Sequence, residues 1–340
     1  MVSASHAASR SISKLQEASN VLTSSLQSST KATPGEQAPS KQELQTLIEG
    51  LKLEASKVGL MWGNNTPSHA EAESLLAGLE QRHSQLLTLL CRAGFSAGPT
   101  LLNSLQSAAS PVTAACVHLL NCISSDKHGE VAVPTGKVWA ACDAAGSTAL
   151  DNKTAIGRKL LHISRSVKDN IREVQDVISE SRLQTSEQQP AHDLEHGSDV
   201  DLDFETEPLR PGEIESAEAA LSLIQAVLDI LKLLVRVILT EQDVSGETTI
   251  DDWESLLFHA KSLADVSNDL AAALFAPQDK DEVVSATDSL QTGCELVLDE
   301  IPDRLRTPQT DILESLAHRV SCAHNSVMTK LSVDMSTLSL

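Results

Sequence analysis

The chain has 340 residues, a formal net charge of −21 at pH 7 and a composition that is 41% hydrophobic but only 2% aromatic. This length exceeds the usual size of one hydrophobic core and predicts two domains, and an apolar content made of Leu, Ala, Val and Ile favours helix bundles over sheets. A surface this acidic repels phosphate groups, which argues against direct binding to nucleic acid or to membranes.

Residues 1–40 form a Ser-rich segment with a weak helical pattern. Apolar residues recur at Ile12, Leu15, Leu22 and Leu26 and then give way to the Ser/Pro/Gly stretch SSTKATPGEQAPS. This composition is typical of a linker. We therefore expect at most a weak, peripheral helix in this segment.

Residues 41–182 show the spacing of amphipathic helices and are predicted to form an N-terminal helix bundle. The expected helices begin near Lys41, Pro67, Pro99, Val138 and Asn152. Pro111 is expected to bend or split the third of them. The last helix carries an apolar seam over 156–178 that a coiled coil would also show, but a helix of an antiparallel bundle needs no second chain, so we favour the bundle.

Residues 183–212 differ in composition and are predicted to be an acidic, disordered linker between the two domains. Against Arg210 alone stand the acidic residues Glu187, Asp193, Glu195, Asp199, Asp201, Asp203, Glu205 and Glu207. Such a segment buries too little apolar surface to order itself. Ser198 precedes acidic residues as in casein-kinase sites and is a candidate phosphorylation site; the alternative is a solvated spacer with no further role.

The linker also contains His192-Asp193-Leu194-Glu195-His196, which has the H-x-x-E-H order of inverted zinc proteases. That chemistry requires a rigid helix, so we interpret the match in this polar segment as accidental. The sequence has no Gly-rich phosphate loop. Its six cysteines include no CxxC pair and are expected to be free thiols. We therefore expect no enzyme activity, no metal and no cofactor.

Residues 213–240 are almost continuously aliphatic and predict a helix that its neighbours bury. The polar interruptions Gln225, Asp229, Lys232 and Arg236 share one narrow stripe at about 100° per residue. This charged stripe indicates a bundle helix rather than a membrane span. Lys232 and Arg236 form a basic spot that is either ion-paired to the acidic linker, which we favour because acidic residues are plentiful, or a candidate partner surface.

Three further helical patterns follow, and with the helix at 213–240 they predict a C-terminal four-helix bundle over 213–340. A separate motif, Arg158-Lys159-Leu160, fits the R-x-L pattern by which some proteins dock on cyclins. Leu160 belongs to the apolar seam of its helix, however. We therefore expect Leu160 to be buried in the core.

Several segments together resemble the cyclin-D-binding protein family, also called cyclin-D-interacting proteins or human homologue of Maid. They are Val138-Trp139-Ala140-Ala141-Cys142, Asp151-Asn152-Lys153, Glu54-Ala55-Ser56 through Met61-Trp62, the acidic linker, and Asn268-Asp269-Leu270-Ala271 through Phe275-Ala276-Pro277. The likeness rests on their order and spacing over about residues 41–300. The last segment lacks the tyrosine and first proline of the family pattern, and residues 1–40 have no counterpart.

The resemblance implies an all-α protein of two antiparallel helix bundles, similar in style to vinculin and α-catenin. It also implies a non-enzymatic regulator in cytoplasm and nucleus that sequesters a D-type cyclin or helix-loop-helix transcription factors and so represses cell-cycle progression or transcription. No basic region precedes any expected helix, so a helix-loop-helix partner paired with this chain would lack one DNA-reading arm. The alternative is a vinculin-like cytoskeletal or scaffold adaptor.

Overall fold

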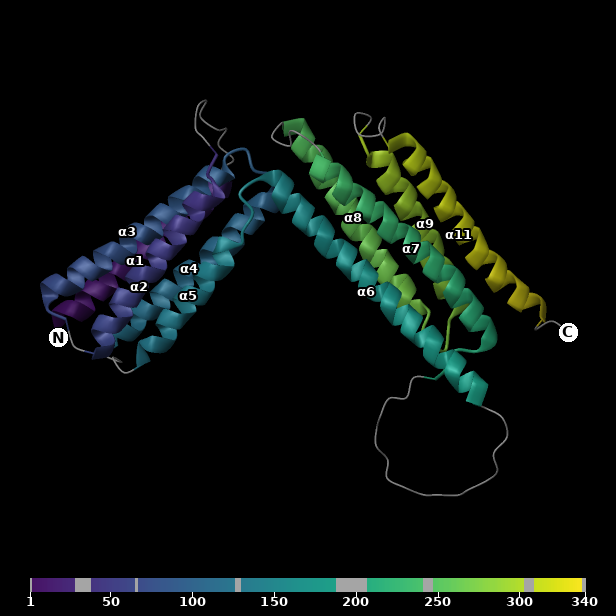
Figure 1. Ribbon diagram of the computed structural model, residues 1–340, viewed down its shortest axis with the longest axis horizontal. Helices are drawn as coiled ribbons and strands as arrows, with labels where there is room; N and C mark the ends of the chain where they lie inside the picture. The colour runs from purple at the N-terminus through teal and green to yellow at the C-terminus, as the bar shows by residue number, and fades with distance from the viewer. Residues whose placement is uncertain are drawn as a thin grey trace, which may run out of the picture. The chain divides into compact units, whose positions relative to one another are not determined.

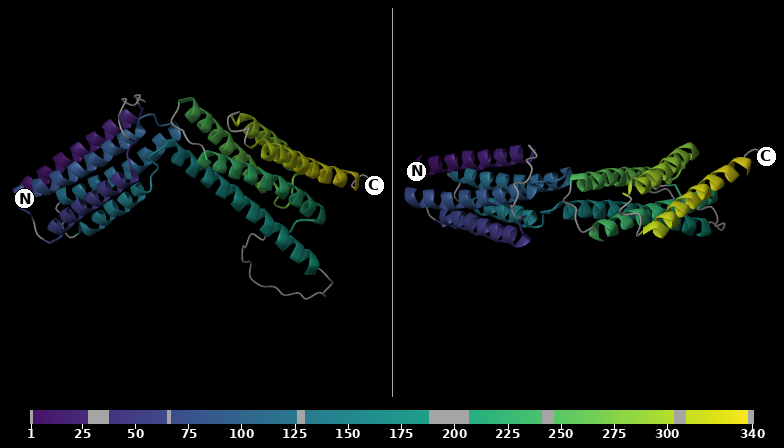
Figure 2. Two further views of the ribbon diagram at one scale, coloured as in Figure 1. Left: turned by 45° about the horizontal axis from the view of Figure 1, so that its top comes forward. Right: turned by 90° about the horizontal axis from the view of Figure 1, so that it is seen from above.

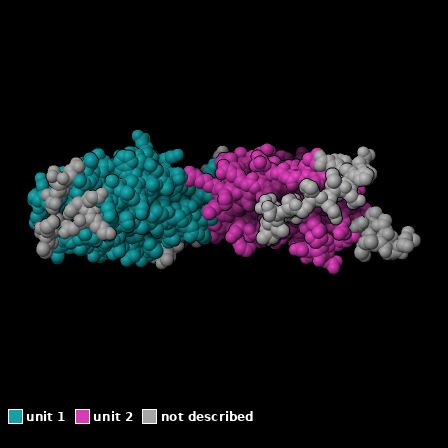
Figure 3. Space-filling view, turned by 90° about the horizontal axis from the view of Figure 1, so that it is seen from below, with its two compact units in different colours: residues 1–156, 244–250 teal, residues 157–243, 251–340 magenta. Residues whose placement is uncertain are grey.

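The computed structural model describes residues 2–27, 38–64, 67–125, 130–187, 207–240, 247–302 and 309–337. Over these residues the regular structure is helical and contains no strand (Figure 1), which confirms the predicted all-α class. The chain divides into two compact units (Figure 3). Unit 1 comprises Met1–Ile156 and Val244–Ile250, and unit 2 comprises Gly157–Asp243 and Asp251–Leu340.

Unit 1 is built from five helices that run alongside one another (Figure 2). They are α1 (Val2–Gln27), α2 (Lys41–Asn64), α3 (His69–Gly94), α4 (Pro99–Ser124) and α5 (Ala132–Gly146). α1 packs against α3 and α4, α2 packs against α3 and α5, and α4 packs against α5. All five helices contribute buried side chains to one apolar core.

Local sequence signals explain where the helices of unit 1 begin and why one of them is not broken. The Ser68 hydroxyl accepts a hydrogen bond from the Glu71 N–H, and the Glu71 carboxylate accepts one from the Ser68 N–H at 2.9 Å. This capping box starts α3 just after the expected Pro67. Pro111 lies inside α4 on its exposed side, and α4 continues through it, because the neighbouring Val112 remains buried in the core. The expected split is therefore not found.

α1 is much more than the weak, peripheral helix expected from residues 1–40. It is 26 residues long, and Leu15, Leu22 and Leu26 are at most 3% exposed. The side chain of Leu26 occupies the space that a Cβ on Gly94 would need, so the helices approach closely there. The leucine spacing, although embedded in a Ser-rich segment, is sufficient to seat α1 in the core.

Unit 2 contains most of α6 (Asn152–Glu187) together with the four helices that follow. These are α7 (Pro211–Thr240), α8 (Glu247–Ala273), α9 (Lys280–Glu300) and α11 (Thr310–Thr337). Residues 157–182 were expected in the N-terminal bundle, but they pack with the C-terminal helices. A Cβ on Gly157 would lie 3.8 Å from Ile238 of α7, and the Ser181 hydroxyl accepts a hydrogen bond from the Leu209 N–H at 3.0 Å. The seam of α6 predicts burial without specifying which helices bury it.

α7 corresponds to the aliphatic helix predicted at residues 213–240, and much of it is buried in unit 2. Leu223, Ile224, Val227, Ile230 and Leu231 are each fully buried. Pro211 opens the helix, where a fixed backbone angle suits the first turn. No helix in the described part of the chain is both long and apolar enough to cross a membrane. α7 packs mainly against α11 and also contacts α9.

Candidate functional site

Trp139 on α5 is an exposed aromatic residue within the V-W-A-A-C segment. Val138 and Cys142, four residues apart, are fully buried and define the core-facing side of α5. Trp139 is turned about 100° from Val138 around the helix and is 47% exposed. The other two tryptophans, Trp62 and Trp253, are at most 1% exposed. A large aromatic side chain on the surface of a bundle is typical of a binding site.

Polar contacts with α2 hold the Trp139 ring in one orientation. Its indole N–H donates to the Ser56 hydroxyl at 3.1 Å, and the Lys52 ammonium lies 5.9 Å from the ring centroid. Lys52 is itself fixed by ion pairs with Asp143 on α5 and, at 3.2 Å, with Glu49. The hydrogen bond that the Lys52 ammonium donates to the Asp143 carboxylate raises the pKa of Lys52 above its ordinary value. Lys52 is therefore charged at neutral pH, and the ring is ordered before any partner arrives.

Exposed leucines of α2 extend this apolar surface. Leu53 is 56% exposed and Leu60 is 66% exposed, and they lie one turn before and one turn after Ser56 on the same side of α2. We call Lys52, Leu53, Ser56, Leu60, Trp139 and Asp143 the Trp139 surface. An aromatic anchor beside aliphatic side chains, with charged residues at the margin, is the arrangement found at protein interfaces.

The D-N-K segment, in contrast, has a structural role. The Asn152 side chain accepts a hydrogen bond from the Gly98 N–H at 2.8 Å and donates one to the Ser96 carbonyl at 3.1 Å. It thereby clamps the turn between α3 and α4, where Ser96 has a positive φ of 61°. Asp151 accepts a hydrogen bond from the Thr154 N–H at 2.7 Å and so caps the start of α6. These residues therefore hold the turn between α3 and α4 and the start of α6.

Lys232 and Arg236, the candidate partner surface, lie exposed on α7. Lys232 forms an ion pair with Asp229 of the same helix at 2.9 Å, and Arg319 of α11 binds the same carboxylate at 2.9 Å. Burial raises the pKa of Asp229, but hydrogen bonds from Lys232 and Arg319 outweigh it and leave the pKa below its ordinary value. The ion-pair partner that the structure shows for Lys232 is thus on its own helix, whereas the acidic linker was expected to supply it. The use of Lys232 and Arg236 by a partner stays a prediction.

The remaining motifs offer no further site in the described residues. Ser198 and the His192–His196 motif lie outside the described residues, as does most of the expected linker. Leu160 is fully buried, so its R-x-L motif is not presented to a cyclin. The six cysteines are free thiols. Within the described ranges, no three His, Cys, Asp or Glu residues are grouped so as to hold a metal ion.

Sequence reasoning identified the V-W-A-A-C segment but not the role of Trp139 within it. The signal was present, because Val138 and Cys142 at a spacing of four fix the buried side of α5 and turn Trp139 away from it. The neighbouring leucines could be found in the same way, because Leu53 and Leu60 fall opposite the core positions Leu51, Ala55 and Val58 of α2. The contact of Trp139 with Ser56 and Lys52 of α2 required the structure.

Two models of one protein family match this chain, and the Trp139 surface lies within the residues that the first of them matches. Residues 43–180 match the N-terminal model, and residues 194–299 match the C-terminal model, of the family described as Grap2 and cyclin-D-interacting. A curated relative, the Cyclin-D1-binding protein 1 homolog of Danio rerio, is 29% identical over 144 residues, which are 41% of this chain and 42% of the relative. The alignment thus spans less than half of that relative. The Trp139 surface falls inside the N-terminal match, whereas α1 and α11 lie outside both matches.

Proposed function

The chain belongs to the Grap2 and cyclin-D-interacting family, and from this premise we propose that it is a non-enzymatic regulator that binds protein partners through its helix surfaces. The proposed partners are a D-type cyclin and helix-loop-helix transcription factors. The description of the family and the name of the Danio rerio relative support the cyclin. Sequestration of these partners in cytoplasm and nucleus would repress cell-cycle progression or transcription.

The exposure of Trp139 is the observation that carries this proposal. The ring is held by Ser56 and Lys52, so binding would not have to order it, and the exposed Leu53 and Leu60 extend the apolar area beside it. Tryptophan is among the residues that contribute most to interface affinity. The acidic charge of the chain favours partners with basic surfaces, because complementary charge accelerates association.

Binding of the full chain to a purified D-type cyclin tests the proposal. We expect Trp139→Ala to weaken binding by about 30-fold, as for a central interface residue. Phe258→Ala is the matched control, because Phe258 is a 69% exposed aromatic residue on α8 of unit 2. This control should bind as the unsubstituted chain does.

Three outcomes would count against the proposal. Unchanged binding of Trp139→Ala would exclude the Trp139 surface as the binding site. If the unsubstituted chain bound neither a D-type cyclin nor a helix-loop-helix factor, the regulator function itself would be wrong. Capture of purified actin or adhesion proteins alone would instead support the scaffold adaptor.

A further inference from the structure

α1 occupies a groove between two other helices of unit 1. It packs extensively on both α3 and α4, whereas α3 and α4 make far less contact with each other than with α1. Among the residues that α1 buries, four are spaced by seven, seven and four positions, namely Ala8, Leu15, Leu22 and Leu26. α3 and α4 therefore form the walls of a groove that accepts an amphipathic helix.

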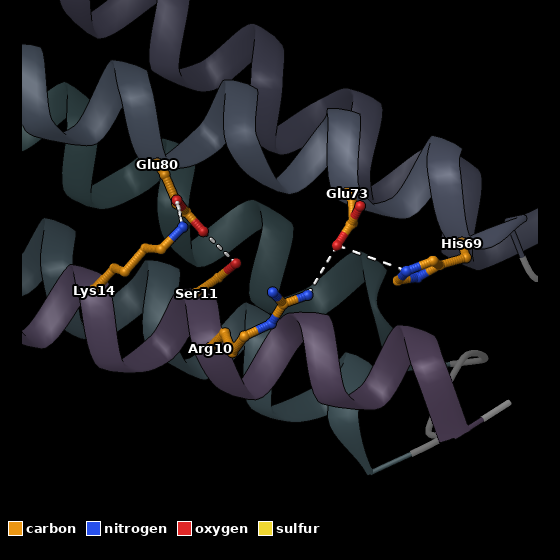
Figure 4. Close-up of polar contacts among 6 residues, drawn as sticks. All are labelled: Arg10, Ser11, Lys14, His69, Glu73 and Glu80. Atoms are coloured by element: carbon orange, nitrogen blue, oxygen red, sulfur yellow. Dashed lines mark hydrogen bonds and ion pairs between the residues drawn. The ribbon is translucent and has the colours of Figure 1, made fainter.

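A row of polar contacts along one edge of the groove sets the orientation of α1 (Figure 4). Arg10 forms an ion pair with Glu73 at 2.8 Å, and Lys14 forms one with Glu80 at 2.8 Å. The hydroxyl of Ser11 also donates to Glu80, and His69 of α3 lies 3.6 Å from Glu73. The basic residues come from α1 and the carboxylates from α3. The groove therefore has an acidic edge that selects a helix with basic residues one turn apart.

Two surface hollows border the contact between α1 and α3. One hollow of about 420 Å³ is lined by residues that include Lys14, Leu22, Leu87 and Cys91. A second hollow of about 210 Å³ lies beside Arg10, Ser11, Glu73 and Glu80. Arg10 and Lys14 are more than half exposed, and exposed ion pairs stabilise little. These ion pairs therefore add little to the stability of α1 in the groove, which its buried apolar side chains hold.

The composition of α1 and its position outside the family matches also distinguish it from the other helices of unit 1. Its sequence, VSASHAASRSISKLQEASNVLTSSLQ, is rich in serine, which favours helices less than alanine, leucine or lysine does. α1 also lies outside the residues that match the family models, whereas both walls of the groove lie inside the N-terminal match. The groove is thus part of the family-matched region and its occupant is not.

We propose that the groove between α3 and α4 is a binding site for a helix of another protein, and that α1 is its internal competitor. The partner helix presents leucines at heptad spacing, with two basic residues one turn apart that pair with Glu73 and Glu80. Binding replaces α1, so the affinity for the partner depends on how often α1 leaves the groove. This site is separate from the Trp139 surface and does not depend on the proposed cyclin binding.

Native-state hydrogen exchange of the full chain provides the first test. The amides of α1 should exchange through an opening that leaves α2, α3, α4 and α5 protected. Exchange of α1 only together with those four helices would overturn the proposal, because α1 would then be an inseparable part of the bundle.

A labelled synthetic peptide of residues 2–27 is the probe for the groove. The double variant Arg10→Glu/Lys14→Glu places negative charge opposite Glu73 and Glu80 and should loosen α1. We expect the full-length variant to bind the peptide about tenfold more tightly than the unsubstituted chain does. Thermal unfolding of both chains checks that the bundle persists.

Charge exchange provides the matched control. A peptide carrying Arg10→Glu/Lys14→Glu should bind poorly to the loosened chain but well to a full chain with Glu73→Lys/Glu80→Lys. Equal binding of both peptides to both chains, or no binding to either, would overturn the proposal. Concentration-dependent dimers of the full chain, detected by sedimentation, would assign the groove to a second copy of this protein and would also overturn it.

Discussion

His83 of α3 lies with its Nε2 atom 2.9 Å from the hydroxyl oxygen of Thr113 on α4, inside the core of unit 1. The Thr113 hydroxyl donates to the Ala109 carbonyl at 3.1 Å, so its oxygen accepts the hydrogen bond from Nε2. The other ring nitrogen, Nδ1, is buried without a hydrogen-bond partner in the described structure. His83 is thus held as a neutral side chain with its proton on Nε2.

The first prediction concerns the pH dependence of stability. Burial lowers the pKa of His83 from 6.5 to about 4, so between these values the unfolded chain binds a proton that the folded chain does not. Stability therefore falls as the pH decreases from 6.5 towards 4. The loss from this residue should reach about 2.5 kcal/mol between pH 7.5 and pH 4.5, measured by urea unfolding of unit 1 within the full chain. His83→Gln should lack this part of the pH dependence, and parallel profiles for the two proteins would contradict the assignment.

The second prediction compares two tryptophans of unit 1. Trp62 is 1% exposed, so Trp62→Ala should destabilise the unit by about 3–5 kcal/mol through loss of burial and the cavity it leaves. Trp139→Ala removes an exposed ring and its hydrogen bond to Ser56, and should destabilise by less than about 1 kcal/mol. Thermal unfolding of the two variants, followed by circular dichroism, measures both losses of stability. Comparable destabilisation by both would mean that Trp139 is structural.

The third prediction concerns the clamp made by Asn152. Asn152→Ala leaves the Gly98 N–H and the Ser96 carbonyl without this partner, and should destabilise unit 1 by about 2 kcal/mol. Asn121→Ala is the control, because Asn121 is exposed on α4 and its replacement should change stability by no more than about 0.5 kcal/mol. If both substitutions had the same small effect, the clamp would not stabilise the turn.

The helices were predictable where apolar spacing is continuous, as in α7, which lies at the residues expected from the sequence. The burial of α1 was underestimated because serines separate its leucines. A helix of this kind is stabilised mainly by tertiary packing, here against α3 and α4. The seam of α6 predicted burial correctly, but the sequence could not indicate that α7 lies beside it. Periodicity specifies which side of a helix is buried and not which neighbour buries it.

The polar contacts of the candidate sites were less predictable than the helices. The Trp139 ring is fixed by Ser56 and Lys52, which lie more than eighty residues away along the chain. The role of Asn152 depends on the positive φ of Ser96, a backbone state that serine rarely adopts. Neither contact follows from local spacing, because each requires two helices to have packed first.

The last prediction uses two neighbouring residues of α7. Leu231 is fully buried, so Leu231→Asp places an unpaired carboxylate in the core of unit 2 at a cost of more than about 4 kcal/mol, which approaches the whole stability of a domain. Lys232 is 56% exposed, and without it Asp229 still binds Arg319. Lys232→Ala should therefore change stability by less than about 1 kcal/mol. Hydrogen exchange of α7, α9 and α11 provides the measurement. A folded Leu231→Asp protein, or an unfolded Lys232→Ala protein, would mean that the buried and exposed sides of α7 are wrongly assigned.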